Sequence, residues 1–265
     1  SSPIARIKDP TDLEILGDLA ARLAKAGIRH PWIWLTQAEV LRRQGKPNQV
    51  IPLLEEAAQR NQLDPTSESH LGRIYFDLKD YASAARLFRR AIKQGEDHPD
   101  SLLVAGKAFL SLAESDTSVA EEAIAEAATA LRRACDGLPQ DPIRRKLLAL
   151  ALARQHQVVQ AVVAIQAAIQ LDPSSATYRM EASALLLSLG RQDMAVAELL
   201  NAARLAPKTH SIIAEVAEQL ARCGEHHHVV TIGEQALSLS SNDTKTRLIL
   251  ANSCFALREW EKVIT

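Results

Sequence analysis

The chain has 265 residues and a formal net charge of −1, with 47% hydrophobic and only 4% aromatic residues. This balance excludes a general nucleic-acid binder, which needs an excess of Lys and Arg to meet the phosphates, and it excludes a surface for anionic membranes. No run of about 18 apolar residues is present, so we expect no insertion into a membrane. The abundant small and aliphatic side chains favour close contact between helices.

Three cysteines, Cys135, Cys223 and Cys254, form no CxxC pair, and their number is odd. A disulfide framework is therefore not expected, and a reducing compartment is favoured. No signal peptide is visible, although the chain begins at Ser1 rather than Met. These features favour the cytoplasm and leave the periplasm open. An alanine-rich chain with few aromatic residues is typical of a bacterial protein.

Residues 1–30 contain one predicted helix, at about 11–26. Its apolar residues recur with helical spacing and would face inward. The helix is either the second half of an incomplete repeat or an N-terminal lid. We therefore separate residues 1–30 from a repeat array over 31–265.

From there on, small residues return at a fixed interval. One ladder advances in steps of 34 residues, with a single step of 43, through Ala38, Gly72, Gly106, Ala149, Ser183, Ala217 and Ala251. A second ladder has its long step at the same place, through Ala57, Ala91, Ala134, Ala168, Ala202 and Ala236. Such a period, with two small residues in each unit, predicts helix-turn-helix repeats that stack on one another. We call the two helices of a repeat A and B.

Prolines and glycines mark the predicted boundaries of these helices. Four prolines in the same register mark the first turn of helix A, where the missing N–H is tolerated: Pro31, Pro65, Pro99 and Pro142. Pro173 and Pro207 instead follow helix B and end it. The turn between A and B is predicted at Gly45, Lys79, His156, Gly190, Gly224 and Arg258.

The third repeat carries an insertion of 9 residues, which we place within 111–122. Ser118 and Glu121 have the spacing of a capping box, so helix B is expected to restart at Ser118. Residues 114–117 would then form a solvated loop. A longer loop of this kind is either a contact site or tolerated drift.

The last repeats depart from the pattern. Val229 stands where a small residue is usual and Gly233 where a bulky one is usual, which predicts a helix B that is either looser or shifted by a residue around Ile232. The seventh repeat has only its first helix and part of the next before Thr265. Solenoids end in polar caps. We therefore expect more chain or a covering subunit at this end, and self-association through it is one possibility.

These ladders resemble the tetratricopeptide repeat (TPR) family over about residues 31–265. The second repeat matches its alternation of bulky and small residues at Leu71, Gly72, Tyr75, Ala84, Phe88 and Ala91. The fourth matches at Leu148, Ala149, Leu152, Ala161, Ile165, Ala168 and Pro173. The resemblance implies an all-α fold, a right-handed α-solenoid of about six full repeats and a truncated seventh.

The resemblance also implies a binding surface, because the A helices of TPR proteins line a concave groove. Transferred by register, the candidate partner-binding residues are Arg43, Arg73, Phe76, Lys107, Lys146, Arg154, Met180, Leu187 and Arg222. This apolar groove with scattered cations suits a peptide or helix with hydrophobic anchors and a few carboxylates. Alternatively, the charges are ordinary solvated side chains.

One variant of the family grips acidic chaperone tails with Lys and Asn at set positions of consecutive A helices. Here Lys146 has Leu150 at the position of the Asn, and Glu181 stands at the position of the next Asn. No consecutive repeats fit, so the sequence argues against chaperone-tail binding.

Signatures of catalysis are missing from the sequence: there is no GxxxxGK[ST], GxGxxG, HExxH or GxSxG. His226, His227 and His228 are adjacent on a predicted helix and point in different directions, so they do not converge on one metal ion. We expect no catalytic residues, no cofactor and no metal site.

The sequence thus predicts a non-catalytic scaffold that binds a partner peptide or helix and no nucleic acid. An alternative is that the repeats are the recognition arm of a larger enzyme, such as a glycosyltransferase or sulfotransferase, or of a bacterial polysaccharide-export machine. A catalytic or β-barrel domain beyond Thr265 would decide for this alternative.

Overall fold

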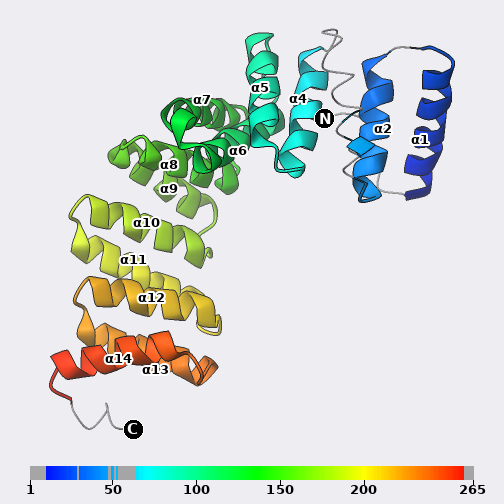
Figure 1. The fold of residues 1–265 in the computed structure, drawn as a ribbon. Coiled ribbons are helices and arrows are strands. Elements are labelled where there is room, and N and C mark those ends of the chain that lie inside the picture. Colours follow the sequence, from blue (N-terminus) through cyan, green and yellow to red (C-terminus); the bar gives the residue numbers. More distant parts are fainter. Residues whose placement is uncertain (1–9, 29, 47–48, 51, 53–63, 260–265) are drawn as a thin grey trace. The chain divides into compact units, whose positions relative to one another are not determined.

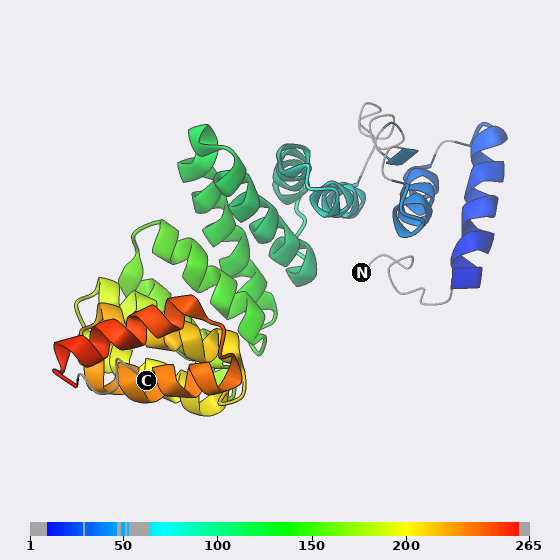
Figure 2. The same cartoon turned by 60° about the horizontal axis from the view of Figure 1, so that its bottom comes forward.

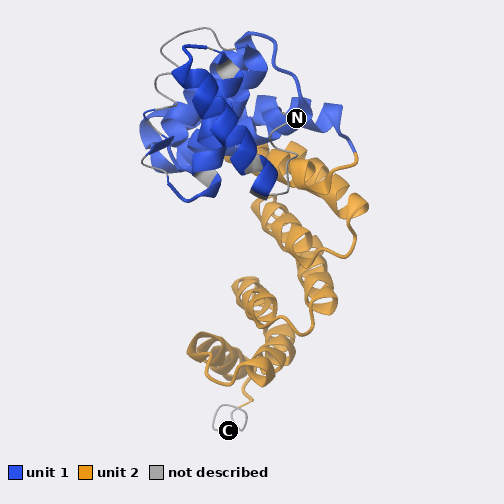
Figure 3. Cartoon of the chain, turned by 90° about the vertical axis from the view of Figure 1, so that its right-hand side faces the viewer, with its two compact units in different colours: residues 1–139 blue, residues 140–265 orange. Residues whose placement is uncertain are grey.

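The computed structural model describes residues 10–28, 30–46, 49–50, 52 and 64–259 (Figure 1). Regular structure in these residues is helical throughout, with no strand among them, which confirms the all-α class. The chain forms two compact units, residues 1–139 and 140–265 (Figure 3). In both, helical hairpins follow one another in chain order.

The first unit contains three described A helices and two described B helices after the N-terminal helix. Its elements are α1 (Pro10–Lys25), α2 (Pro31–Arg43), α4 (Pro65–Asp77), α5 (Tyr81–Lys93), α6 (Pro99–Ser115), the 3₁₀ helix η2 (Thr117–Val119) and α7 (Ala120–Gly137). The A helices α2, α4 and α6 begin at the predicted prolines. Local caps support these starts: the backbone N–H of Ser67 donates to Asp64 Oδ1 at 2.9 Å.

The second unit stacks seven helices in regular succession, as Figures 1 and 2 show. They are α8 (Pro142–Arg154), α9 (Val158–Leu171), α10 (Ala176–Ser188), α11 (Gln192–Leu205), α12 (His210–Arg222), α13 (His226–Leu239) and α14 (Thr244–Ala256). The starts of α8, α10, α12 and α14 keep the 34-residue interval of the ladders. The A helices are therefore α8, α10, α12 and α14.

The two ladders of small residues form the contact between helices A and B. Every described member is buried except Ala251, which is half-buried, while Ala57 lies outside the described residues. A Cβ on Gly106 would lie 2.4 Å from Leu131 Cγ, and one on Gly72 would lie 3.1 Å from the Phe88 ring. Small residues are needed here because the bulky residue of helix B enters the space they leave.

The A–B turns have the same backbone geometry in all six predicted positions. Their φ angles are 69° at Gly45, 63° at Lys79, 60° at His156, 70° at Gly190, 76° at Gly224 and 62° at Arg258. This is the left-handed region that commonly ends a helix. The three non-glycine residues adopt it at some conformational cost. The predicted turns are confirmed.

The insertion in the third repeat takes a different form from the prediction. Helix α6 continues to Ser115, and Asp116 then accepts hydrogen bonds from the backbone of Ser118, at 2.9 Å, and from its hydroxyl. Because Asp116 holds Ser118, no capping box forms, and α7 begins at Ala120 without a side-chain cap. The predicted loop over 114–117 and the restart at Ser118 are wrong. The added residues instead lengthen both helices, to 17 and 18 residues.

The sixth repeat has a continuous helix B, α13, and both Val229 and Gly233 are buried in it. Leu250 of α14 lies 3.5 Å from where a Cβ of Gly233 would be, so a side chain of the next helix lies close to the site of the missing bulky residue. Ile232 is buried in the core cluster of this unit. A helix B that is looser or shifted around Ile232 stays a prediction.

Candidate partner-binding surfaces

The nine candidate residues all lie on A helices, but in different units, so each unit is described by itself. Within one A helix the fifth, ninth, twelfth and thirteenth residues fall on one side, because the ninth lies three or four positions from each of the others. We call this side of α2, α4 and α6 the first inner face. The same side of α8, α10, α12 and α14 is the second inner face.

On the first inner face, two of the four candidates already have partners. Arg43 Nε donates to Glu39 Oε1 at 2.7 Å, and Glu39 is buried, so this charge is compensated within α2. Phe76 is half-buried and packs against Tyr81 of α5, with ring centroids 5.8 Å apart. It gives this face an aromatic edge.

Arg73 and Lys107 differ from the other cations. They occupy equivalent positions of the successive A helices α4 and α6, and both are half-buried. Neither side chain has a hydrogen bond or ion pair with any residue of the described part of the chain. One turn before Arg73, the buried Ser69 hydroxyl also has no partner there. The first inner face thus presents two uncompensated positive charges.

On the second inner face, Lys146 is paired with an acid of the next repeat. Lys146 Nζ of α8 lies 2.8 Å from Glu181 Oε1 of α10. Arg154 is half-buried in the last turn of α8. The pairing of Lys146 links two consecutive repeats and leaves less of its charge for a ligand.

The two apolar candidates of the second unit belong mostly to its core. Met180 is 7% exposed and packs in the cluster around Leu199 and Ile213. Leu187 is half-buried and packs against the smaller cluster of Val162, Leu186 and Ala195. Neither side chain offers a large free apolar surface.

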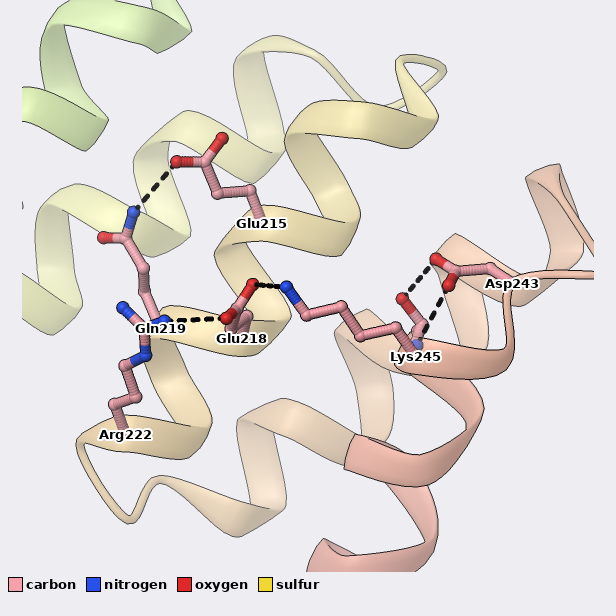
Figure 4. Close-up of polar contacts among 7 residues, drawn as sticks. Glu215, Glu218, Gln219, Arg222, Asp243 and Lys245 are labelled. Carbon is pink, nitrogen blue, oxygen red and sulfur yellow. Dashed lines mark hydrogen bonds and ion pairs between the residues drawn. The ribbon is translucent and has the colours of Figure 1, made fainter.

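Between α12 and α14 the second inner face holds a polar cluster, shown in Figure 4. Glu218 accepts hydrogen bonds from Lys245 Nζ at 2.6 Å and from Arg222 Nη2 at 2.7 Å. Gln219 Nε2 donates to Glu215 at 3.3 Å. These side chains line a hollow of about 360 Å³. The sequence placed Arg222 on this face, but its pairing with Glu218 was not predicted.

Hydrogen bonds stabilise the charged forms of two carboxyl groups in this cluster. Donation from Lys245 lowers the pKa of Glu218 below its ordinary value. Asp243 caps α14 by accepting from the hydroxyl and the backbone N–H of Thr246, the latter at 3.1 Å, and these bonds lower its pKa as well. The cluster is therefore self-satisfied at neutral pH.

The described residues offer no arrangement for metal chemistry: no three His, Cys, Asp or Glu side chains among them are grouped to hold an ion. Within the triple histidine, His226 Nδ1 lies 3.3 Å from Ser253 Oγ, whereas His227 and His228 are exposed. No helix in the described ranges is long and apolar enough to cross a bilayer.

A sequence model of the tetratricopeptide repeat matches residues 35–99 and 70–142, and the same 34-residue hairpin continues through the second unit. The chain is a TPR protein. Among curated proteins, no relative of it was found.

Solved structures with the same fold cover most of this TPR protein. The C-terminal part of a TPR repeat-containing protein from Cytophaga hutchinsonii aligns with a TM-score of 0.67 at 13% identity, over 91% of this chain and 99% of that one. YrrB, described as a TPR protein with an unusual peptide-binding site, gives 0.61 at 18% identity, over 71% and 92%. MamA from Desulfovibrio magneticus gives 0.56 at 20% identity, over 66% and 94%.

Proposed function

We propose that this TPR protein is a non-catalytic scaffold that holds a peptide or helix of a partner protein against its A helices. One observation carries the proposal: Arg73 and Lys107 recur at equivalent positions of α4 and α6 without a counter-charge in the described residues. A half-buried cation is partly desolvated, and an incoming carboxylate would compensate it with a charge-assisted hydrogen bond.

The surroundings of these cations suit a peptide that also carries an apolar anchor. Phe76 supplies an aromatic edge one turn after Arg73 on α4. Rigid aromatic and Arg side chains are frequent anchors of protein interfaces. The peptide-binding site named for YrrB, a protein with the same fold, supports a peptide as the ligand class. The alternative of a recognition arm on a larger enzyme would use the same surface.

The test is a binding assay with defined peptides. Peptides of 12 residues are selected from a displayed random library on the whole chain, and the Kd of the best one is measured by fluorescence anisotropy. We expect the selected sequences to be acidic, and the Arg73→Glu/Lys107→Glu variant to bind at least about tenfold more weakly, since truncated charge pairs at interfaces commonly cost more than 1.4 kcal/mol.

Arg86→Glu/Arg132→Glu is the matched control. It makes the same change of net charge in the same unit, at two exposed arginines of the B helices α5 and α7. Its Kd should stay within about twofold of the wild-type value, because a distant exposed charge acts only through a screened field. Equal losses in both variants, or selected peptides with no excess of acidic residues, would disprove the proposal. Circular dichroism melting checks that each variant is folded.

A further inference from the structure

A second hollow, of about 470 Å³, opens between α5 and α7 on the B-helix side of the first unit. We call it the outer slot. The apolar part of its lining is the half-buried Ile92 of α5, with Phe109 of α6 and Ala130 of α7 almost fully buried at its floor. None of the residues that line it belongs to the inner faces, so a ligand bound here would leave Arg73 and Lys107 free.

One ion pair joins α5 to α7 at one end of the slot, and a second joins α7 to the loop between α5 and α6 at the other end. Arg89 of α5 contacts Glu126 of α7 in a bidentate manner, with Nε–Oε1 and Nη2–Oε2 both 2.7 Å. Arg133 of α7 donates from Nη2 to Asp97 Oδ1 at 2.7 Å and to the Glu96 carbonyl at 3.1 Å. Glu126 and Arg133 are separated by two helical turns, which is about 10 Å. The walls are therefore held apart before any ligand arrives, which lowers the cost of binding.

The slot is empty of protein side chains because α7 is built from small residues there. Ala125, Thr129 and Ala130 line it from α7, and the Thr129 hydroxyl is turned back to the Ala125 carbonyl at 3.0 Å. Opposite them stand the longer Ile92 and Lys93 of α5. The space lies in the range of sites that hold one large group.

The electrostatics of the lining select the occupant. Lys93 is exposed on the rim and has no ion pair within the described segments. Glu126 is the acidic residue in the lining, and Arg89 engages both its oxygens. The guanidinium of Arg89 also lies 5.7 Å from the centroid of the Phe109 ring. The remaining charge in the slot is positive, which complements an anion and opposes a cation.

We propose that the outer slot is a second docking site, for a partner-protein segment that inserts one side chain of Leu or Phe size next to an Asp or Glu. The apolar side chain would lie over Phe109 and Ile92, and the carboxylate would meet the ammonium group of Lys93 at the rim. Because Lys93 stands at the edge rather than on the floor, the apolar and charged groups must be separated, as they are on neighbouring residues of a peptide.

The experiment uses the full ¹⁵N-labelled chain and two matched peptides, acetyl-Asp-Leu-Phe-Glu-amide and acetyl-Lys-Leu-Phe-Lys-amide. The acidic peptide should give saturable amide shifts at residues 89–93 and 125–133. The basic peptide should bind at least about fivefold more weakly, and Lys93→Glu should reverse this preference, since the rim charge changes sign. Arg132→Glu, an exposed change on α7 outside the slot, should leave both affinities unchanged.

A second variant fills the space. Ala130→Phe should abolish the shifts from the acidic peptide, and Lys93→Glu remains informative if the larger side chain disturbs folding. No saturable shift at millimolar peptide, or equal affinity for the two peptides, would overturn the proposal. Tighter binding of free 4-phenylbutanoate than of the acidic peptide would overturn the assignment to a protein segment. The Arg73→Glu/Lys107→Glu variant should bind in the slot normally, which separates this test from that of the inner face.

Discussion

The inner faces of the two units differ in whether their cations have acidic partners. In the first unit, Arg73 and Lys107 have no counter-charge among the described residues. In the second unit, Lys146 pairs with Glu181 of the next repeat, and Glu218 binds both Arg222 and Lys245. A cation on an A helix therefore either pairs with an acid of its own or a neighbouring helix or stays available for a ligand. The difference depends on whether an acid stands within reach.

The units also differ in how their helices fit together. The first unit places Gly72 and Gly106 beneath bulky residues of helix B, with no space for a Cβ at Gly106. The second unit uses Ala149, Ser183 and Ala217 at the same positions, all buried. The first unit thus leaves less room for a side chain at this position of helix A than the second unit does.

The largest expected effect tests this packing. Leu131 is fully buried against Gly106, so Leu131→Ala should lower the free energy of unfolding by about 2–5 kcal/mol. In the wild-type background Gly106→Ala should cost roughly 1–3 kcal/mol by overpacking. In the Leu131→Ala background the same change should stabilise, because the new methyl group fills the cavity and alanine favours the helix. Urea titrations measure all four proteins.

The matched control for this cycle lies in the second unit. Ser183→Ala removes a hydroxyl that contacts the Met180 carbonyl at 2.7 Å and Gln219 Oε1 at 3.1 Å, so a change of about 1 kcal/mol is expected, with no dependence on Leu131. Additive effects of Gly106→Ala and Leu131→Ala would contradict the close contact between these helices.

The next effect concerns binding of the selected acidic peptide. Lys146→Glu/Arg222→Glu makes the same change of charge on the second inner face as Arg73→Glu/Lys107→Glu makes on the first. Lys146 and Arg222 already form ion pairs with acids of their own unit. We therefore expect less than about a threefold change in Kd, compared with at least about tenfold for the variant of the first inner face. A reversed order of the two variants would locate the ligand on the second unit instead.

Lowering the pH should affect the stability of the two units differently, because they contain carboxyl groups whose pKa values are shifted in opposite directions. Burial raises the pKa of Glu68 in α4 above its ordinary 4.5, despite its bond with Arg90. Glu68 therefore holds a proton more readily in the folded protein than in the unfolded chain. Its contribution to the free energy of unfolding falls as the pH rises from 4.5 through the raised pKa. The lowered pKa values of Glu218 and Asp243 have the opposite effect. The stability that these two carboxylates give the folded protein is present above their ordinary pKa values and is lost as the pH falls through the lowered ones.

Amide hydrogen exchange in the full chain can follow the two units separately. Between neutral pH and about pH 4, Glu218→Gln should reduce the loss of protection in α12 and α14. Glu68→Gln should make the protection of α4 more sensitive to acid. The reason is that the amide cannot take up the proton that favours the folded state at low pH. If neither variant alters the pH profile of its own unit, the titration of these groups does not contribute to stability.

The smallest expected effect is that of a single link between repeats. Lys146 and Glu181 are each about one-third exposed, so a double-mutant cycle with alanine should give a coupling energy of only about 0.2–1 kcal/mol, reduced by added salt. A value near zero at low salt would show that this pair does not hold the repeats together. The second inner face would then depend on the cluster around Glu218.

The spacing of residues was enough to predict the helices and turns. The starts of α2, α4, α6 and α8 at prolines, the buried ladders and the left-handed turns all follow from local backbone preferences repeated every 34 residues. The same reasoning failed at the insertion, because Asp116 and Glu121 both offered partners to Ser118, and only the folded backbone decides between them. The resemblance to the TPR family, transferred through this register, predicts where a binding face lies on each repeat.

Which charges remain available was decided by the tertiary structure. Lys146 and Glu181 are 35 positions apart, and Glu218 and Lys245 are 27 apart, so their pairing depends on how successive hairpins stack and which rotamers then meet. The outer slot likewise exists only because small residues of α7 face longer ones of α5 between two ion pairs. A periodic sequence determines which side of a helix a residue occupies, because that is a local property. Contacts across repeats are not local, and only the packed helices determine them.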